Sequence, residues 1–546
     1  MLTLLTSISN LKQEGLYKFR RISSFIFIFI ISINANADDY PRDWNVDVRH
    51  YKFELVLNDN NNRIEGKCTL IVYFKEDTDA FVLDLIKEND GTGMVISNLK
   101  IDGVESTFTH INDKVTITTP GGFKKGSQFI VMIQYNGVPS DGLIISKNKY
   151  GERTFFGDNY PTRARHWLPT VDHPSDKATL EWVITAPDKY EVIGNGLKIE
   201  ESLLEGGKKL TRWKQSVPIS TKIMVIGVSR FAVLQSGMVN NVPIESWVYP
   251  QNREDGFFDY APAVEIVRFF DSFIGEYPYE KLANVQSKTR YGGMENASNI
   301  FYYEGSVTGK QNINKLLAHE IAHQWFGNSV TEKSWHHAWL SEGLTSYFTH
   351  LYVEYFRGIE AKKEGLRKDR EKIIKYYKKN PHPIVYTSVT DYVKMLNTNT
   401  YQKGSWVMNM LRKKIGDEYF YSGMRTYYKR FRDGNVLTDD LKNVMEEISN
   451  TELDLFFDQW VYKQGHPNLD IKWKYNKSKE TVDVTIVQLQ DTKFDFDIEL
   501  EIDGTIYSVY VNEQETKKSF TIENEPARII ADPDVWLLFE GKISKQ

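Results

Sequence analysis

Two histidines and a glutamate in the run "HEIAH" have the residue types and spacing of a zinc site. His319 and His323 stand four residues apart, so on a helix they lie on one face, about one turn from each other. Two neutral imidazoles placed in this way can fill two positions of a tetrahedral zinc ion. Glu320 is rotated around the helix from His319, so its carboxylate points beside the metal, where it can take a proton from water. The run therefore predicts a site for metal-assisted hydrolysis.

Glu342 is the predicted third ligand. It lies nineteen residues past His323, after a loop and at the head of the next apolar stretch. A helix–loop–helix hairpin of this size brings the carboxylate against the first helix, and two histidines, one glutamate and an open position make a catalytic zinc site. We expect one Zn²⁺ per chain; the alternative is a pair of hydrogen-bonded core histidines. His336 and His337 compete as ligands, but their place in the loop favours supporting or surface positions, and Glu332 of the same loop is expected to be solvated.

Two helices must hold this site. Apolar residues recur with helical period in "NINKLLAHEIAHQWFGN" and again in "SEGLTSYFTHLYVEYF". Asn312 or Asn314 is expected to cap the first helix, and Gly327 to end it. The glutamate of the second run then stands in the first turn of its helix.

Around these helices the sequence predicts β-structure on both sides. Residues from Asp38 to about Val233 alternate at period two, helical period starts at about Asn240, and alternation returns after "WVYKQGHPNL". We therefore expect a multidomain α+β protein. The expected divisions are a signal peptide at 1–37, an N-terminal β domain at 38–238, a mainly helical zinc catalytic domain at 239–465 and a small β-sandwich at 466–546.

Composition narrows the class of protein. With 41% hydrophobic and 26% charged residues in 546, the chain has the balance of soluble globular domains. A formal net charge of -5 gives no case for a nucleic-acid partner. The single cysteine, Cys68, cannot form an internal disulfide, so stability must come from apolar cores and metal. No stretch after residue 37 is apolar enough to predict a membrane span.

The N-terminus has the pattern of an export signal. Lys18, Arg20 and Arg21 precede an apolar run at Ile22–Ile33, and an A-x-A-like site ends at Ala37. The apolar run is too short to cross a bilayer as a stable helix. We therefore expect a cleaved signal and a periplasmic or secreted protein.

Several motifs together resemble the gluzincin aminopeptidases, the family of aminopeptidase N and leukotriene hydrolase. At the predicted zinc site the resemblance lies in "HEIAH", the gap of eighteen residues and "WLSEG". Elsewhere "GGMEN" is similar to the exopeptidase motif G-x-M-E-N, "YQKGSWVMNML" to the tyrosine motif, and "ARHWLPTVDHP" to the N-terminal signature. The resemblance covers nearly the whole chain after residue 37. It implies an N-terminal β saddle, a thermolysin-like catalytic domain and a small β sandwich, without the C-terminal helical domain of many members and hence with a more open site.

The resemblance also implies roles that spacing alone does not assign. Tyr401 would be a second donor to the oxyanion of the tetrahedral intermediate. Glu295 would bind the substrate's α-ammonium at a fixed distance from zinc. The remaining substrate-binding residues of this motif would be Gly292, Gly293, Met294 and Asn296, with the glycines letting the substrate backbone approach closely. Without the resemblance, "GGMEN" would predict only a turn.

One position departs from the family pattern. Five residues before Arg165 the family usually has Gln or Glu, which helps to bind the amine or the first side chain, and this chain has Tyr160. We therefore expect amine binding to depend more on Glu295, with Tyr160 in the substrate site. The first-residue preference of relatives does not carry over.

These inferences together predict a zinc-dependent aminopeptidase acting on peptides with a free N-terminus. Zinc would activate water and polarise the scissile carbonyl, while Glu320 serves as general base and then general acid. The alternatives are an endopeptidase or an epoxide hydrolase on the same scaffold, and a non-catalytic peptide-binding protein. Cleavage of N-acetylated peptides would favour the endopeptidase, and a zinc-loaded protein inert on aminoacyl reporters would favour the binding protein.

Overall fold

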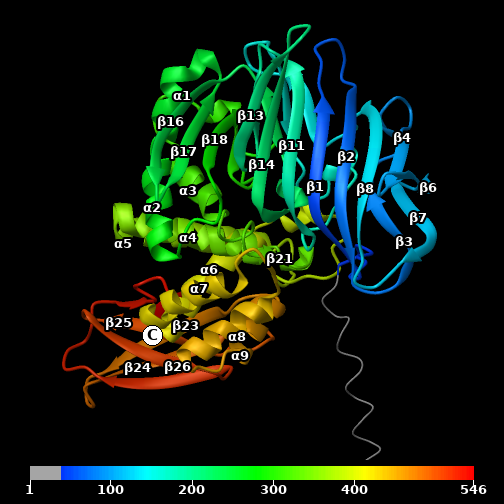
Figure 1. Ribbon diagram of the computed structural model, residues 1–546. Helices are drawn as coiled ribbons and strands as arrows, with labels where there is room; N and C mark the ends of the chain where they lie inside the picture. Colours follow the sequence, from blue (N-terminus) through cyan, green and yellow to red (C-terminus); the bar gives the residue numbers. More distant parts are fainter. Residues whose placement is uncertain (1–37) are drawn as a thin grey trace, which may run out of the picture.

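The computed structural model describes residues 38–546, and the predicted signal peptide at 1–37 lies outside the described residues. Strands fill the first part of the chain, helices the middle, and strands return at the end, which confirms the predicted α+β organisation (Figure 1). Buried apolar side chains form one continuous core from Val46 to Leu538. Between residues 38 and 546, no helix combines the length and apolarity needed to cross a bilayer.

A large sheet organises the N-terminal region. Buried positions alternate along β1 and β2, as expected for a sheet with one solvated face. β1 pairs with β11 in parallel and with β2 in antiparallel register. The order across the sheet is β13 (Leu197–Leu204), β14 (Lys208–Ser220), β11 (Lys177–Pro187), β1 (Val46–Val56), β2 (Ile64–Phe74), β8 (Gln128–Val138), β4 (Gly93–Ile101) and β5 (Val104–Glu105).

Two smaller sheets complete this region. One contains β3 (Thr78–Asp84), β7 (Lys114–Phe123) and β6 (Phe108–Ile111). The other contains β12 (Glu191–Gly194), β15 (Ile226–Ser229), β10 (Arg153–Gly157) and β9 (Leu143–Lys147). The predicted β character of this part of the chain is confirmed.

A further sheet lies in the part of the chain predicted to be helical. Its order is β16 (Ala232–Val239), β17 (Val242–Val248), β18 (Leu282–Ser287), β20 (Asn299–Tyr303) and β19 (Gly293–Met294). β17, β18 and β20 run parallel, and β18 is buried along its whole length. A strand buried on both faces shows no alternation at period two. The prediction of uninterrupted helical structure after Asn240 is therefore wrong, and "GGMEN" contributes an edge strand rather than a simple turn.

Helices occupy the middle of the molecule. α4 is the central one and packs against α3, α5 and α6. Figure 1 shows α1 and α2 beside the sheet that contains β16, β17 and β18. The helices are α1 (Arg253–Tyr260), α2 (Ala263–Phe273), α3 (Asn314–Ala322), α4 (Trp339–Arg357), α5 (Ile359–Tyr377), α6 (Gly404–Ile415), α7 (Asp417–Phe431), α8 (Thr438–Ser449) and α9 (Asp454–Phe457). One π-helical turn at Asn399–Lys403 leads into α6, another at Asp458–Tyr462 follows α9, and a short pair joins β21 (Thr331–Glu332) to β22 (Asn435–Val436).

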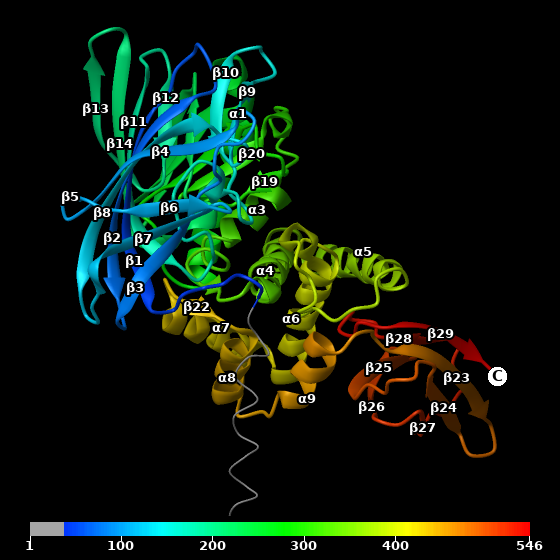
Figure 2. The ribbon, with the colours of Figure 1, turned by 90° about the vertical axis from the view of Figure 1, so that its right-hand side faces the viewer.

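Two sheets form the C-terminal region, which lies next to α6 and α9 (Figure 2). The first contains β27 (Glu515–Thr521), β24 (Thr481–Gln488), β23 (Asn468–Asn476) and β29 (Glu540–Lys545). The second contains β26 (Thr505–Val511), β25 (Phe496–Ile502) and β28 (Ile529–Ala531). The predicted return to strands is confirmed.

Candidate metal centre and active site

The zinc motif lies at the end of α3. His319 is in its last turn and His323 is the C-terminal cap residue, so helical period places both rings on one side. Ile313 holds the N-cap position, and no side chain caps the helix. The expected cap by Asn312 or Asn314 is therefore wrong. Packing of α3 against α4 supplies the stability that a cap would have added.

Gly327 lets the chain turn between α3 and α4. Its φ of 109° lies in the left-handed region that favours glycine, and a Cβ built on it would meet Ser341 Oγ at 2.2 Å. This close approach brings the first turn of α4, which holds Glu342, against the end of α3. The predicted hairpin geometry is present in the structure.

Three donor atoms from these helices lie at ligand spacing. His319 Nε2 is 3.2 Å from His323 Nε2. Glu342 Oε2 is 3.1 Å from His323 Nε2 and 3.5 Å from His319 Nε2. Ligands of a tetrahedral zinc, each about 2.0–2.1 Å from the ion, lie roughly 3.3–3.4 Å apart. The three residues therefore fit a zinc ion, which they would hold through these atoms.

The surroundings of His323 orient it as a ligand. Its Nδ1 lies 3.1 Å from Phe326 O, so the Nδ1 proton can be donated to that carbonyl and Nε2 is left for a metal. Tautomer selection by the second ring nitrogen is the usual arrangement around a metal-binding histidine. Glu342 Oε2 is buried, and within residues 38–546 no hydrogen bond of acceptable geometry reaches it. A buried oxygen of this kind fits a cation better than it fits an empty core.

The charges of the cluster also suit a cation. Burial opposes the charge on Glu342, but His323 and His319 outweigh burial and hold the pKa of the Glu342 carboxyl well below its usual value. Burial likewise lowers the pKa of His323, but Glu342 and Glu295 overcome this and raise it to about 10. The cluster thus holds a proton on the His323 imidazole, and this proton must leave when a metal binds.

Glu320 lies beside the three donors and is 5% exposed. Burial raises the pKa of its carboxyl well above the usual value; His323 opposes the rise and Glu295 adds to it. Carboxylate oxygens of Glu295 and Glu320 and a ring nitrogen of His323 all lie within 4.8 Å of one another. A Cβ built on Gly293 would meet Glu320 Oε1 at 2.3 Å, so the space left by this glycine is filled by Glu320.

Hydrogen bonds fix the backbone of Glu295 to α3 and the turn that follows. Gln324 Nε2 and Asn328 Nδ2 donate to Glu295 O at 2.8 and 2.6 Å. Lys177 Nζ, from the large sheet, donates in turn to Asn328 O and Ser329 O at 3.0 and 2.6 Å. Sequence reasoning missed all three donors, although Gln324 and Asn328 lie one and five residues after His323.

A small cavity of about 50 Å³ lies over the cluster. It has room for an ion and a water-sized group, since one water needs roughly 10–15 Å³. Gly292 is exposed outside its wall, and Asn296 is fully buried behind it. The wall consists of Tyr160, Tyr291, Gly293, Met294, Glu295, His319, Glu320, His323, Glu342, Leu396 and Tyr401.

Two tyrosines from distant parts of the chain face this cavity. The Tyr401 ring stacks on His319 with centroids 6.0 Å apart. The Tyr160 ring packs edge-on against Trp335 at 5.4 Å. Burial, with the Glu342 charge, raises the pKa of both phenols well above the usual value, so both keep their protons as donors at neutral pH.

The loop histidines lie away from the cluster. His336 Nε2 is 3.1 Å from Val389 O, and His337 Nδ1 is 2.8 Å from Thr438 Oγ1. Both side chains are buried. The predicted supporting or surface positions are therefore wrong, because these rings tie the loop to distant segments instead.

Glu332 is buried rather than solvated. Its carboxylate forms an ion pair with Lys222, and both side chains are at most 1% exposed. The Lys222 Nζ also lies 5.7 Å from the Tyr160 ring centroid and 5.4 Å from that of Trp335. The prediction for Glu332 is wrong because its partner, 110 residues away, comes from the N-terminal β region.

Two glycines let α4 and α6 cross closely. A Cβ built on Gly343 would lie 2.9 Å from Gly404 Cα and 3.1 Å from Thr400 O. Gly343 follows Glu342 directly, and the π-helical turn that holds Tyr401 leads into Gly404. This contact therefore sets the distance between Tyr401 and the metal cluster.

Gly343→Ala is expected to lower the free energy of unfolding by about 1–3 kcal/mol, the usual cost of overpacking. The new Cβ would meet backbone atoms, which cannot move aside as a side-chain end can. Urea denaturation followed by circular dichroism measures the change. Gly365→Ala is the matched control, because its Cβ would meet only the His350 side chain. Equal or higher stability of Gly343→Ala would contradict the close crossing.

Comparisons with known proteins agree with this architecture. Residues 258–460 match the model of the peptidase family M1 domain, and residues 48–223 match that of the peptidase M1 N-terminal domain. The glutamyl aminopeptidase of Mus musculus is 28% identical over 334 residues, covering 58% of this chain and 35% of the relative. The probable aminopeptidase 2 of Sulfurisphaera tokodaii is 26% identical over 440 residues, covering 76% and 54%. The chain thus spans about a third to a half of the length of these curated relatives.

The fold and the site together define a class of protein. A set of candidate metal ligands from an HExxH helix and a glutamate of the next helix is the arrangement of gluzincin metallopeptidases. The chain belongs to the M1 peptidase family.

Proposed function

We propose that this protein is a zinc-dependent aminopeptidase that removes N-terminal residues from peptides. The observation that carries the proposal is the Glu295 carboxylate, 5% exposed and held beside Glu320 and His323 by a fixed backbone. A carboxylate at a set distance from the hydrolytic centre can pair with a substrate's α-ammonium and so place the first peptide bond over that centre. Relatives named as aminopeptidases support the same activity.

Each residue of the cluster has a proposed part in the reaction. His319, His323 and Glu342 would hold the ion, which supplies a Lewis acid that activates water and polarises the scissile carbonyl. Glu320 accepts the proton of the attacking water and passes it to the departing amine. Tyr401 keeps its phenolic proton and donates a hydrogen bond to the developing oxyanion.

Substrate contacts beyond the amine are also proposed. The cavity of about 50 Å³ is too small for a peptide residue, so the first side chain would extend past its wall beside Tyr160, Tyr291 and Leu396. The remaining proposed contacts of the "GGMEN" motif are Gly292, Gly293 and Met294, whereas Asn296 is fully buried and would act only by supporting them.

A panel of aminoacyl-coumarin reporters, with and without a zinc chelator, tests the proposed function. We expect release of coumarin from free aminoacyl reporters, loss of activity with the chelator and recovery on adding zinc. Cleavage of N-acetylated peptides in place of these reporters would show an endopeptidase. A zinc-loaded protein inert on the whole panel would refute the enzymatic proposal.

Glu295→Ala is expected to lower kcat/KM on free-amine substrates by about ten- to a hundred-fold, because charge-assisted contacts contribute roughly 1.5–3 kcal/mol. Zinc content should be unchanged, since this carboxylate is not one of the three donors. Any weak activity on N-blocked peptides should persist. Glu254→Ala, which removes an exposed carboxylate, is the control for the change of net charge. An equal loss on free and blocked substrates would reduce Glu295 to a structural role.

The proposed domain division follows the order of sheets and helices. It comprises an N-terminal β saddle at 38–238, a thermolysin-like catalytic domain at 239–465 and a β-sandwich at 466–546.

The protein is proposed to be exported, with residues 1–37 removed. Asp38 supports this cleavage point, because its carboxylate is already part of the fold: it accepts a hydrogen bond from Trp335 N at 2.8 Å and contacts His173 Nε2 at 3.1 Å. Mass spectrometry of the exported protein should find Asp38 as the first residue.

A further inference from the structure

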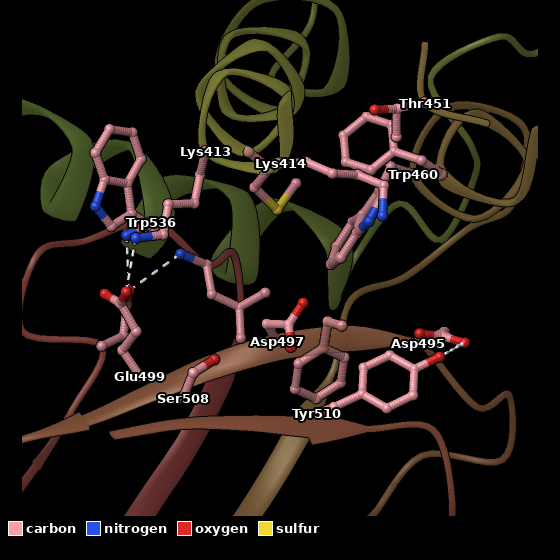
Figure 3. A pocket seen from close by; sticks show the side chains of 15 residues that line it. Lys413, Lys414, Thr451, Trp460, Asp495, Asp497, Glu499, Ser508, Tyr510 and Trp536 are labelled. Carbon is pink, nitrogen blue, oxygen red and sulfur yellow. Dashed lines mark hydrogen bonds and ion pairs between the residues drawn. The ribbon is translucent and has the colours of Figure 1, made fainter. Parts of the chain in front are cut away.

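A second and larger cavity lies where the helices meet the C-terminal sheets. Its volume is about 440 Å³, within the range of roughly 300–1,000 Å³ typical of small-molecule sites. Figure 3 shows its floor formed by strands that carry Asp497 and Ser508, with Lys413 and Lys414 reaching in from a helix opposite. The strands are β25 and β26, and the helix is α6. None of its lining residues belongs to the wall of the metal cavity.

Most charged groups in this cavity already have partners. Lys413 Nζ lies 2.6 Å from Glu499 Oε1. The Tyr510 hydroxyl donates to Asp495 Oδ2 at 2.7 Å. Asp532, at the far end, is paired with Arg370 at 2.9 Å. These groups are satisfied and build the walls.

Asp497 and Lys414 are the two charged lining residues without a partner in the described part of the chain, and both are exposed to solvent. Among residues 38–546, no hydrogen bond or ion pair reaches either side chain, and Figure 3 draws none for them. Burial raises the pKa of Asp497, while Lys414 lowers it and Asp495 and Glu499 add to the rise. A cation near Asp497 would therefore be favoured. Lys414 is near enough to act on this carboxyl, yet the two do not form a pair.

Aromatic and aliphatic side chains make up most of the remaining lining. Trp460 is 2% exposed and Phe456 6%, so little of either ring reaches the cavity, while Tyr510 is half exposed. Trp460 and Tyr510 lie on the same side of the pocket as Thr451 and Asp495. An occupant must then offer a positive group to Asp497, a negative group to Lys414 and an apolar body to the rings.

We propose that this cavity binds a free α-amino acid with an apolar or aromatic side chain, its ammonium on Asp497, its carboxylate on Lys414 and its side chain against the Tyr510 ring. A zwitterion of this size pairs with both charges at once, whereas a simple cation or anion would leave one of the two without a partner. The bound molecule joins α6 to β25, and so connects the helical region to the C-terminal sheets. The site does not depend on the proposed peptidase activity.

Isothermal titration of the full-length protein with L-phenylalanine tests the proposal. L-phenylalaninamide lacks the carboxylate and N-acetyl-L-phenylalanine lacks the ammonium, so each should bind at least about ten-fold more weakly, the usual worth of a charge-assisted contact. Lys414→Met should weaken binding of L-phenylalanine by a similar factor and leave binding of L-phenylalaninamide unchanged. Asp497→Asn should weaken binding of L-phenylalanine and of L-phenylalaninamide, and leave binding of N-acetyl-L-phenylalanine unchanged.

Two controls distinguish this site from the metal cavity and from a general effect of lysine charge. Lys413→Met removes the neighbouring lysine, which is already paired with Glu499, and should leave binding of L-phenylalanine intact. Glu295→Ala should also leave it intact, whereas binding in the metal cavity would be lost in that variant. Peptide hydrolysis should be unchanged in Asp497→Asn and Lys414→Met. Absence of saturable binding, or binding insensitive to both Asp497→Asn and Lys414→Met, would overturn the proposal.

Discussion

Glu320→Gln is expected to reduce kcat by about a thousand-fold while zinc content stays at one ion per chain. General acid–base groups contribute typically 10²–10⁴-fold, and Glu320 is the carboxylate placed beside the three metal donors without being one of them. The amide has the same shape but cannot accept the proton of the attacking water. Steady-state kinetics together with metal analysis of the same preparation measures both quantities.

The same substitution has an expected effect on stability. Burial raises the pKa of Glu320, so at neutral pH the fold disfavours its charged form relative to the unfolded chain. The stability linked to this group is present below the unfolded pKa and falls as pH rises through the folded pKa. Gln removes that dependence, so metal-free Glu320→Gln should melt at or above the temperature of the metal-free parent at pH 7. A variant that melts lower, or that loses zinc, would show that Glu320 is structural or is itself a ligand.

Glu342→Ala is expected to lose zinc and, with it, nearly all activity. Residues that only support a metal ligand contribute 10–100-fold to metal affinity, so removing a ligand should weaken zinc binding by more than about 100-fold. The substitution also leaves His323 buried without the carboxylate that raises its pKa to about 10. Titration of metal-free protein with zinc against a chelator of known affinity gives the change directly.

Glu342→Gln separates the loss of a ligand from the loss of packing. The amide fills the same space in the first turn of α4 but lacks the negative charge, so its zinc affinity should also fall while circular dichroism stays that of the parent. Exposed Glu360, on the neighbouring helix, gives a matched Glu→Gln control. Full zinc occupancy in Glu342→Ala would remove this residue from the ligand set.

Local pattern was enough to predict the core of the candidate site. His319 and His323 share a face because helical period repeats every 3.6 residues, and this rule needs no knowledge of the rest of the chain. The place of Glu342 in the first turn of α4 followed from the loop length and the next apolar run. The position of Tyr401 could not be chosen among 31 tyrosines by pattern, and came from its resemblance to a family motif.

The local sequence pattern did not predict features that depend on burial or on a partner distant in the sequence. The strands β17, β18 and β20 were missed because central parallel strands are covered on both faces, which erases alternation. Glu332 was predicted to be solvated because it falls in the loop between the two helices, and its partner is supplied by the N-terminal β region. Burying one charge is tolerated only when the fold delivers the opposite charge to the same place.

The sequence by itself thus determined the ligand types, their spacing along two helices and the order of β, helical and β regions. Tertiary structure alone decided how these parts meet: the backbone of Glu295 fixed by Gln324 and Asn328, and the glycine crossing that places Tyr401 by the cluster. The physical reason is the distance along the chain over which each interaction acts. Helix period and turn preference act over a few residues, whereas hydrogen bonds and close helix contacts join segments brought together only by folding.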